Sequence, residues 1–531
     1  MTDGDSFIFA SKAFATMTAG CLGSGVVFLT YGMKMAGLFV GISTLIICAF
    51  VSIVTHSIYV VGSLELGAVD LSTLLMRASA YKKIGEFLSR RKSAEDNKED
   101  LEKLNNSQNL VLTRNEVEEM RQNMKFHFKS ISIICFLSMA YAVPVYFILL
   151  RSFTEDLITH AIFTFPEVKI LGYLKDHYVL SAIYFLMILP FASKSKITEL
   201  DFLGWFSVVS FFTLASVIVI RTTLVPYTGP MPPVTDVVNF WPSHGALSAF
   251  KMFTFGTYAF LCHCLVVPAV LNVNNCSAKR CIAVISSSFA FLCAFSLALT
   301  VSAYLYYGEA VKENITLNFS ACDIFMGFSR ILSCISLCVI IPLFSVSICN
   351  FIIHDIGLIN YMADLAVEDA FQTIFKYRDE ENGHFMLKVR DDESVSNVLT
   401  DLKTVMRARK ARTIESDADA NINNLKSNSG IDKSRSERLE SRRFLISTVL
   451  LLTCIFLSHV AKTCTQYVEL FCGYIDAFTA SIYPLFIYII IWRRNKSPFF
   501  NFAVILACCI SAVGPILSSL VTTYELFVPD S

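Results

Sequence analysis

Long apolar runs alternate with polar connections along this chain, and two of the polar segments are much longer than the rest. A helix needs about 20 mainly apolar residues to cross the hydrocarbon core of a bilayer. Runs near this length predict eleven membrane-spanning helices, at residues 12–32, 37–62, 129–150, 177–193, 201–221, 246–271, 281–307, 324–353, 443–462, 467–492 and 499–525. The pattern therefore predicts an all-α integral membrane protein.

The composition supports a membrane protein and excludes some other classes. Hydrophobic residues make up 54% of the 531 residues and charged residues only 17%, against about 25% in soluble domains. The formal net charge is zero, which gives no reason to expect a nucleic acid partner. Many of the 17 cysteines fall within apolar runs, where a thiol acts as a small hydrophobic group. We therefore expect no disulfide framework, no metal site and no cofactor other than a coupling ion.

The two long polar segments divide the chain into five parts. These are the first two spans (1–62), a charged insertion (63–128), six further spans (129–356), a second insertion (357–442) and the last three spans (443–527). Both insertions combine low hydrophobicity with mixed charge, and we expect most of the second to be disordered. Segments of this kind often bind other proteins, so either insertion could carry a partner site.

The distribution of basic residues predicts the orientation in the membrane. Lys and Arg are concentrated in both insertions and in the short connections at 194–196, 278–280 and 492–496. The positive-inside rule then places the N-terminus in the cytoplasm and the C-terminus outside or in a lumen. Glycosylation sequons begin at Asn314 and Asn318, in a connection expected on that outer side. The plasma membrane and a vacuolar or lysosomal membrane are both compatible with this topology.

The first apolar segment contains Gly23, Ser24 and Gly25 in its middle. Glycine disfavours a helix interior by about 1 kcal/mol relative to alanine, and an interrupted helix is tolerated in hydrocarbon only where it faces protein or a water-filled cavity. The helical half that starts near Gly25 would point its N–H groups at an anionic ligand such as a carboxylate. The alternative is that these small residues only let another helix pack closely.

The sixth segment is irregular too, because it combines Gly256, His263 and Pro268. Interrupted helices at corresponding positions of two five-helix halves indicate a transporter built from inverted repeats, with its site near the middle of the membrane. Carbonyl groups released in the sixth helix would suit an ammonium group. A carboxylate at one break and an amine at the other together describe an amino acid.

Side chains near the two breaks are the candidates for lining the site. The hydroxyl candidates are Ser24, Thr254 and Thr257, and the aromatic candidates are Phe255 and Phe260. Aromatic side chains at helical spacing also occur in ordinary cores, so packing remains an alternative for both phenylalanines. No charged residue lies close to the first break, which favours neutral amino acids over acidic or basic ones.

These segments resemble the amino acid/auxin permease family. The first is similar to that family's GSG-containing opening helix, and FGTYAFLCHCLVVP is similar to its Phe-rich sixth helix with Cys-His. Further likeness lies in SAYLYYGEAVKENITLNF after the seventh span and in GYIDAFTASIYPLFIYI in the tenth. The resemblance implies secondary transport of amino acids by a LeuT-like fold, in which spans one to five and six to ten are inverted repeats and one helix is added.

Two positions in the first and eighth spans bear on the identity of the coupling ion. Sodium-coupled members of the family have an Asn and a Thr at positions that correspond here to Ala19 and Ile340, neither of which can coordinate sodium. Thr18 and Ser336 could supply oxygen atoms from neighbouring turns, so sodium stays open, but proton coupling or facilitation is favoured. His263 is the candidate for the proton, because imidazole titrates near neutral pH. A neutral histidine that is hydrogen-bonded to a neighbouring helix is the alternative.

Two other functions compete with transport. A membrane-embedded acyltransferase could use His263 as a general base, but such a base needs a positioned substrate or nucleophile, and the sequence shows no second catalytic group beside it. A receptor that senses amino acids would be expected to have a large ectodomain or signalling tail, and the outer connections are short. A transporter that also acts as a sensor through the first insertion is compatible with the sequence.

Overall fold

The computed structural model describes the helical core and short parts of the insertions. The described residues are 13–15, 17–19, 21, 25–68, 71–95, 110–112, 114–193, 201–224, 238–243, 245–271, 277–351, 377–378, 385–387, 431–460, 464–492 and 497–527. Most of the second insertion, which we expected to be disordered, lies outside these ranges.

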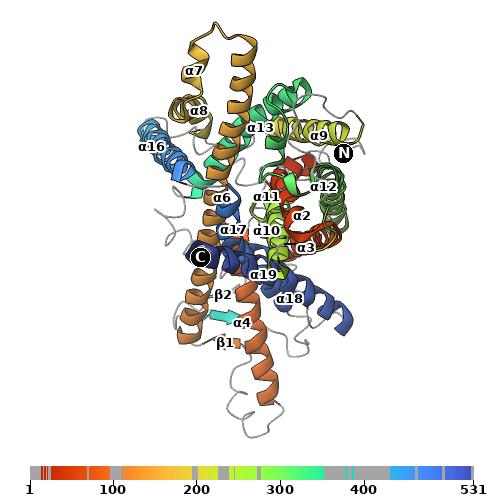
Figure 1. Ribbon diagram of the computed structural model, residues 1–531. Helices are drawn as coiled ribbons and strands as arrows, with labels where there is room; N and C mark the ends of the chain where they lie inside the picture. The colour runs from red at the N-terminus through yellow and green to blue at the C-terminus, as the bar shows by residue number, and fades with distance from the viewer. Residues whose placement is uncertain are drawn as a thin grey trace, which may run out of the picture.

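Helices account for most of the described chain (Figure 1). The α-helices are α2 (Leu29–Ala36), α3 (Leu38–Leu66), α4 (Leu71–Glu95), α6 (Arg114–Thr164), α7 (Ile170–Leu174), α8 (His177–Ala192), α9 (Asp201–Thr223), α10 (Ala249–Ala259), α11 (His263–Leu271), α12 (Ala278–Tyr307), α13 (Ile324–Phe351), α16 (Ile431–Val460), α17 (Cys464–Phe471), α18 (Tyr483–Ile491) and α19 (Pro498–Phe527). The 3-10 helices are η1 (Gly25–Phe28), η3 (Ala246–Ser248), η4 (Gly308–Ala310) and η5 (Ile315–Asn318).

Eight helical stretches in the described part of the chain are long and apolar enough to cross a membrane. They are Leu38–Leu66, Gln122–Thr164, Trp205–Thr223, Ala278–Ala310, Ile324–Val346, Arg443–Val460, Val468–Ile491 and Pro498–Tyr524. Each overlaps one of the predicted spans. The other three predictions fall on the shorter apolar helix α8 and on the two segments that were expected to be interrupted.

The first insertion is more regular than its charge suggested. Helix α4 lies within it, and α6 begins inside it at Arg114, before the predicted start of the third span at residue 129. Figure 1 shows α6 running the length of the molecule with α4 beside its lower part. The hydroxyl groups of Ser72 and Ser132 are 2.8 Å apart and join the two helices. Part of the insertion therefore packs as helix against the helical core.

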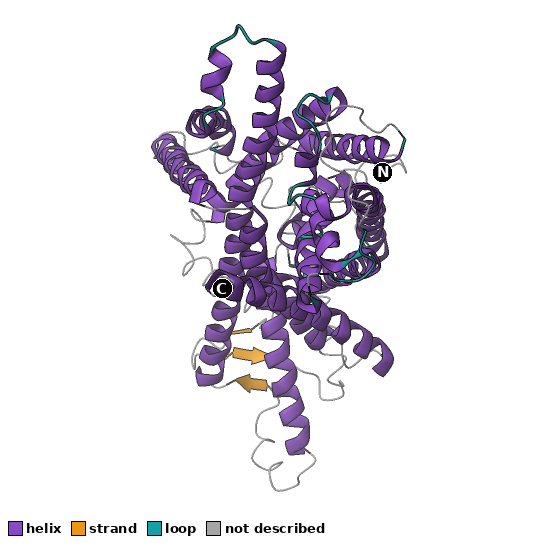
Figure 2. Ribbon diagram, in the orientation of Figure 1, coloured by secondary structure: helices purple, strands orange, loops and turns teal. Residues whose placement is uncertain are grey.

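Three short strands add a small sheet to the helical protein that the sequence predicts. They are β1 (Leu110–Leu112), β2 (Tyr377–Arg378) and β3 (Phe385–Leu387), and they form one antiparallel sheet in the order β1-β3-β2 (Figure 2). Val111 is opposite Met386, which is also opposite Tyr377. Because β1 belongs to the first insertion and β2 and β3 to the second, the sheet connects the two.

The tenth predicted span is not a regular α-helix. Two π-helical turns, η7 (Cys472–Asp476) and η8 (Phe478–Ile482), separate α17 from α18. A Cβ atom on Gly473 would lie 2.2 Å from the carbonyl oxygen of Pro515 in α19. This glycine therefore allows the widened helix to pack directly on the last span.

Ion pairs join connections that are far apart in the sequence. Three of them link residues near the ends of the first, third, fifth, seventh and eighth spans: Lys34–Glu309 at 4.0 Å, Arg221–Asp323 at 2.9 Å and Arg330–Asp156 at 3.0 Å. Ends of the second and tenth spans meet elsewhere, where the Trp492 indole donates to Glu65 at 2.9 Å.

The two outer sequons are folded into the protein. Asn314 caps η5 by accepting a hydrogen bond from the Thr316 amide, and Asn318 donates to the carbonyl group of Ala310. Their side chains are almost fully buried. A glycan needs an exposed acceptor, so the expectation that these sites could be glycosylated is wrong for the folded protein.

Candidate functional site

The sixth segment is interrupted, as the sequence predicted. Helix α10 ends at Ala259, a turn at Phe260 and an irregular stretch follow, and α11 begins at His263. The break is not at the residues that suggested it. Gly256 lies inside α10, where a Cβ atom would be 2.9 Å from the sulfur of Cys48, and Pro268 lies inside α11. Gly256 therefore serves close packing against α3.

The first segment changes conformation at its glycines. Residues up to Cys21 are α-helical where they are described, and the chain from Gly25 forms the 3-10 helix η1, which continues into α2. Gly23 and Ser24 lie outside the described residues. The nearest described residues are Cys21 before them and Gly25 after them.

The irregular parts of the two segments are in direct contact. A Cβ atom on Gly25 would lie 2.5 Å from the Cα atom of Ala259, the last residue of α10. Beside this contact, the thiol groups of Cys21 and Cys262 are hydrogen-bonded to each other. Two stretches more than two hundred residues apart in sequence thus meet where each departs from α-helical geometry.

The two aromatic candidates pack between helices. Phe255 is fully buried, and its ring centroid lies 6.2 Å from that of Phe28 and 6.1 Å from that of Tyr31. Phe260 is also buried and lies edge-on to Phe289 at 6.0 Å. Their contacts are those of core side chains, which was the alternative interpretation for both.

The two threonine candidates differ from each other. Thr257 hydrogen-bonds to Cys48 of α3. Thr254 is fully buried, and its hydroxyl oxygen has no hydrogen-bond partner among the described residues. Its carbonyl group accepts a bond from the thiol of Cys472 in η7 at 3.7 Å. A buried hydroxyl without a partner costs free energy, so Thr254 is the better candidate for a ligand contact.

His263 lies at the start of α11 in a buried cluster with residues of α3. Its Nε2 atom is 3.1 Å from the Thr55 hydroxyl, and its ring stacks on that of His56 with centroids 3.8 Å apart. The Nε2 atom of His56 is in turn 3.3 Å from the Cys262 sulfur. The Nδ1 atom of His263 is buried without a partner in the described part of the structure. His263 thus packs against α3, and its Nδ1 atom is available for a further hydrogen bond.

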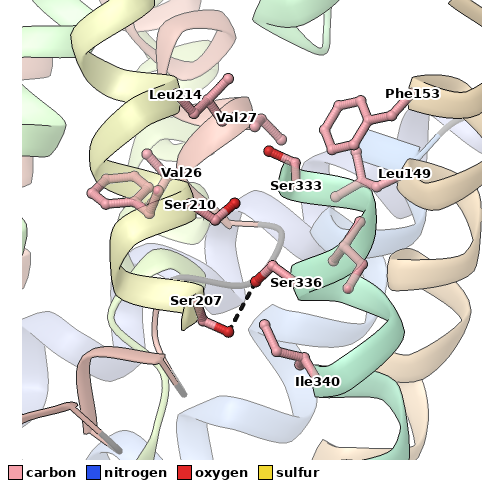
Figure 3. A pocket seen from close by; sticks show the side chains of 12 residues that line it. Val26, Val27, Leu149, Phe153, Ser207, Ser210, Leu214, Ser333, Ser336 and Ile340 are labelled. Carbon is pink, nitrogen blue, oxygen red and sulfur yellow. Dashed lines mark hydrogen bonds between the residues drawn. The ribbon is translucent and has the colours of Figure 1, made fainter. Parts of the chain in front are cut away.

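A pocket lies beside η1, between α6, α9 and α13, and has a cavity volume of about 30 Å³ (Figure 3). Figure 3 shows hydroxyl groups from α9 and α13 facing this space, contributed by Ser207, Ser210, Ser333 and Ser336. Ser336 donates to Ser207 at 2.9 Å. Ser336, a candidate for the coupling ion, thus lines a polar pocket, which Ile340 also lines. None of the candidates Thr254, Phe255, Thr257 and Phe260 lines it.

Thr18, another candidate for the ion, is fully buried, and its hydroxyl oxygen has no partner in the described ranges. It precedes Cys21 in the helical part of the first segment. The structure thus leaves an available oxygen at this position, but it does not bring Thr18 together with Ser336 in the pocket.

Among the buried charged residues that were not singled out from the sequence, three lie in α10 and in elements packed against it. Asp476 in η7 is fully buried and accepts hydrogen bonds from Ser138 at 2.7 Å and from Tyr141, both of α6. Lys251 of α10 and Glu469 of α17 form a buried ion pair at 3.6 Å. All three are ionisable residues inside predicted spans, which are functional candidates by default. Applying that rule to every span would have found them.

The sequence of the core decides the family. Residues 133–526, about three quarters of the 531 residues, match the sequence profile of the transmembrane amino acid transporter protein family. The chain belongs to this family. It is therefore a multi-pass membrane transporter rather than an enzyme, and the resemblance seen in its motifs is confirmed. The match begins in the third span, so the first break lies outside the matched range and the second lies within it.

Other comparisons add little to this assignment. No curated protein sequence matches the chain. Among solved structures, an Eremococcus coleocola manganese transporter in complex with an aromatic bis-isothiourea substituted compound aligns with 98% of this chain and 88% of its own, at 8% identity and a TM-score of 0.38. A nucleobase-cation-symport-1 family transporter in a closed conformation with bromovinylhydantoin bound aligns with 97% and 91%, at 10% identity and a TM-score of 0.29. Likeness at these TM-scores carries no argument about this chain.

Proposed function

We propose that the protein moves neutral amino acids across a membrane by alternating access and binds them where the first and sixth spans are interrupted. The contact of Gly25 with Ala259 is the observation that carries this proposal. This contact brings the start of η1 next to the end of α10. A zwitterion between them would have its carboxylate near the N–H groups that begin at Gly25 and its ammonium group near the carbonyl groups of residues 259–262.

The side chains around this junction support a small polar ligand. The Thr254 hydroxyl and the His263 Nδ1 atom are buried polar atoms without partners in the described structure. Ligand groups can satisfy such atoms, which otherwise reduce stability. Ser24, Gly23 and Thr257 complete the proposed polar lining, and Phe255 and Phe260 hold the helices that frame it.

The proposed architecture is a LeuT-like fold of eleven spans. Spans one to five and six to ten form the inverted repeats, and α19 is the added helix. The N-terminus is cytoplasmic, and the C-terminus lies outside or in the lumen of a vacuole or lysosome. Support comes from the interrupted sixth span and from the ion pairs that join the expected outer connections.

We further propose that transport is proton-coupled or facilitated rather than driven by sodium. The pocket at Ser336 contains hydroxyl groups, but Ile340 occupies part of its wall, and the described residues that line it include no carboxylate. Thr18, Ser336 and His263 remain the candidates named from the sequence for holding an ion. A protein partner at the two insertions is supported by the sheet that joins them.

Amino acid exchange by the purified protein tests the proposed function. Proteoliposomes are loaded with one unlabelled neutral amino acid, and entry of the same labelled amino acid is followed at equal pH and salt on both sides. The proposal predicts entry that stops when the internal amino acid is omitted. Liposomes without protein are the control. Folded protein that exchanges no amino acid in a panel of neutral, acidic and basic ones would refute the proposal.

A further inference from the structure

The described residues bury three carboxylates, and one of them differs from the other two. Asp323 is paired with Arg221 at 2.9 Å, and Glu469 is paired with Lys251 at 3.6 Å. Asp476 has no basic side chain within ion-pair distance in the described part of the chain, and its hydrogen-bond donors are the hydroxyl groups of Ser138 and Tyr141. A cation holds a carboxylate in its ionised form, whereas hydroxyl partners can serve both forms.

The hydrogen bonds of Asp476 are compatible with both its ionised and its protonated form. The Ser138 hydroxyl donates to Oδ1 at 2.7 Å, and the Tyr141 hydroxyl donates to Oδ2. A protonated carboxyl group becomes a donor, and a hydroxyl group can turn to accept from it. Both hydrogen bonds to the carboxyl group can therefore be kept when it binds or releases a proton.

The helix around Asp476 is adapted to this position. Asp476 ends the π-helical turn η7, and π-helical turns within α-helices are frequent at functional sites. The turn also reaches the proposed amino acid site. Cys472 donates to the carbonyl group of Thr254, and the ring of Tyr141 lies 6.0 Å from that of Tyr258. Both contacts are with α10, which ends at the break.

Other titratable groups near Asp476 are compensated or neutral. They are Tyr141 on α6, Cys472 on η7, Tyr258 and Lys251 on α10, Glu469 on α17 and Tyr59 on α3. The charges of Lys251 and Glu469 offset each other. From α19, the Thr522 hydroxyl donates to the carboxylate of Glu469 and the Ser519 hydroxyl donates to its backbone carbonyl group. Figure 1 shows α6, α10, α17 and α19 meeting at the centre of the molecule.

His263 is less suited to carry the proton. Its ring stacks on that of His56 at 3.8 Å, so a charge on either imidazole would be opposed by a charge on the other. Its Nε2 atom is also held by Thr55. The geometry therefore favours a neutral, hydrogen-bonded histidine.

We propose that Asp476 is the proton-binding site of this transporter. On one side of the membrane its carboxylate takes a proton from hydronium, giving a carboxylic acid and water, and on the other side it returns the proton to water. Through Tyr141, Cys472 and α10, the protonation state of Asp476 affects the closure of the break at Phe260–Cys262. This inference rests on the proposed transport of amino acids.

The test compares two modes of transport in proteoliposomes that contain the full-length protein. Exchange at equal pH requires no net movement of protons, whereas accumulation driven by a pH gradient does. The variant Asp476→Asn keeps the size of the side chain but cannot ionise. We expect it to exchange neutral amino acids and to show no accumulation above equilibrium under a pH gradient of either polarity. In His263→Gln, whatever exchange remains should still be accompanied by accumulation under the pH gradient.

The control is the double variant Lys251→Met/Glu469→Leu, which removes the neighbouring buried carboxylate without leaving an unpaired charge. It should keep accumulation driven by the pH gradient. If Asp476→Asn also loses exchange, the variant Tyr141→Phe tests the role of Asp476 instead. It removes one hydrogen-bond donor to the carboxylate and should displace the pH profile of accumulation by about half a pH unit or more. An unchanged profile overturns the inference.

The outcomes separate the two proposals. No exchange by the wild type refutes transport itself, and the inference falls with it. If the wild type exchanges amino acids and Asp476→Asn accumulates them as well as the wild type does, the protein is a transporter but Asp476 is not its proton-binding site. Accumulation driven only by a sodium gradient also overturns it.

Discussion

Gly25 and Ala259 are in backbone contact at the point where the first and sixth spans both depart from the α-helix, with 2.5 Å between an ideal Cβ on Gly25 and the Cα atom of Ala259. The neighbouring atoms belong to the backbone, so they cannot rotate away as a flexible side chain could. Because the proposed site is framed by these two residues, the contact makes Gly25 the position at which the site is most sensitive to added volume.

Gly25→Ala should therefore reduce exchange of neutral amino acids by about 100-fold, since displacements near 1 Å can have effects of this size on a bound substrate. The measurement is initial exchange rate per folded protein in proteoliposomes. Gly327→Ala in α13 is the matched control, because nothing lies within 4 Å of its added Cβ atom. Equal rates for the two variants would show that the contact does not frame the site.

Thr254→Val should separate a ligand contact from a packing role. The hydroxyl oxygen of Thr254 is buried without a partner in the described structure, so replacing it by a methyl group should stabilise the substrate-free protein by about 1 kcal/mol. If the hydroxyl binds substrate, the KM for exchange should rise about fivefold. Thermal unfolding and exchange kinetics measure the two effects. A more stable variant with an unchanged KM would exclude Thr254 from the site.

The buried pair of Lys251 and Glu469 should matter for stability. Removing one partner leaves an unpaired buried charge, which costs about 3–5 kcal/mol, so Lys251→Met and Glu469→Leu should each lower the temperature of unfolding strongly. The double variant should recover most of the loss, because it leaves neither charge behind. Thermal unfolding in detergent provides the comparison. Losses that simply add in the double variant would mean that the two residues do not act as a pair.

Sodium should not be required. The serine-lined pocket has Ile340 in its wall, and apolar side chains cannot coordinate sodium, which prefers several oxygen ligands. Replacing sodium by potassium at constant pH should therefore leave uptake nearly unchanged, and Ser336→Ala should behave like the wild type in both salts. If uptake collapses without sodium and Ser336→Ala weakens its dependence on sodium, the pocket is a sodium site after all.

The spans could be predicted from sequence because apolar length is a local property. The location of the sixth break could not, because it depends on tertiary contacts. Gly256 suggested a break, but it is inside α10 since Cys48 of α3 packs against it. The break falls instead at Phe260–Cys262, where the sequence shows neither glycine nor proline.

The environment of Asp476 could not be predicted from the sequence either. Its hydrogen-bond partner Ser138 lies 338 positions earlier in the chain, and no local pattern reports a pairing over that distance. The helix α4 was not predicted from the sequence for a different reason. Its many charges suggested a solvated insertion, although residues such as Leu, Ala, Lys, Glu and Arg are also strong helix formers.

The most direct test of the central claim, that substrate binds where the two broken spans meet, uses the protein's own Cys262. This cysteine lies in the break of the sixth span beside Cys21 and His56. The measurement is alkylation of Cys262 by a membrane-permeant maleimide, mapped by peptide mass spectrometry with and without saturating substrate. Cys454 in α16, which is also buried, is the control. Substrate should slow alkylation of Cys262 and leave that of Cys454 unchanged. Alkylation of Cys262 that is unaffected by every amino acid the protein exchanges would contradict the claim.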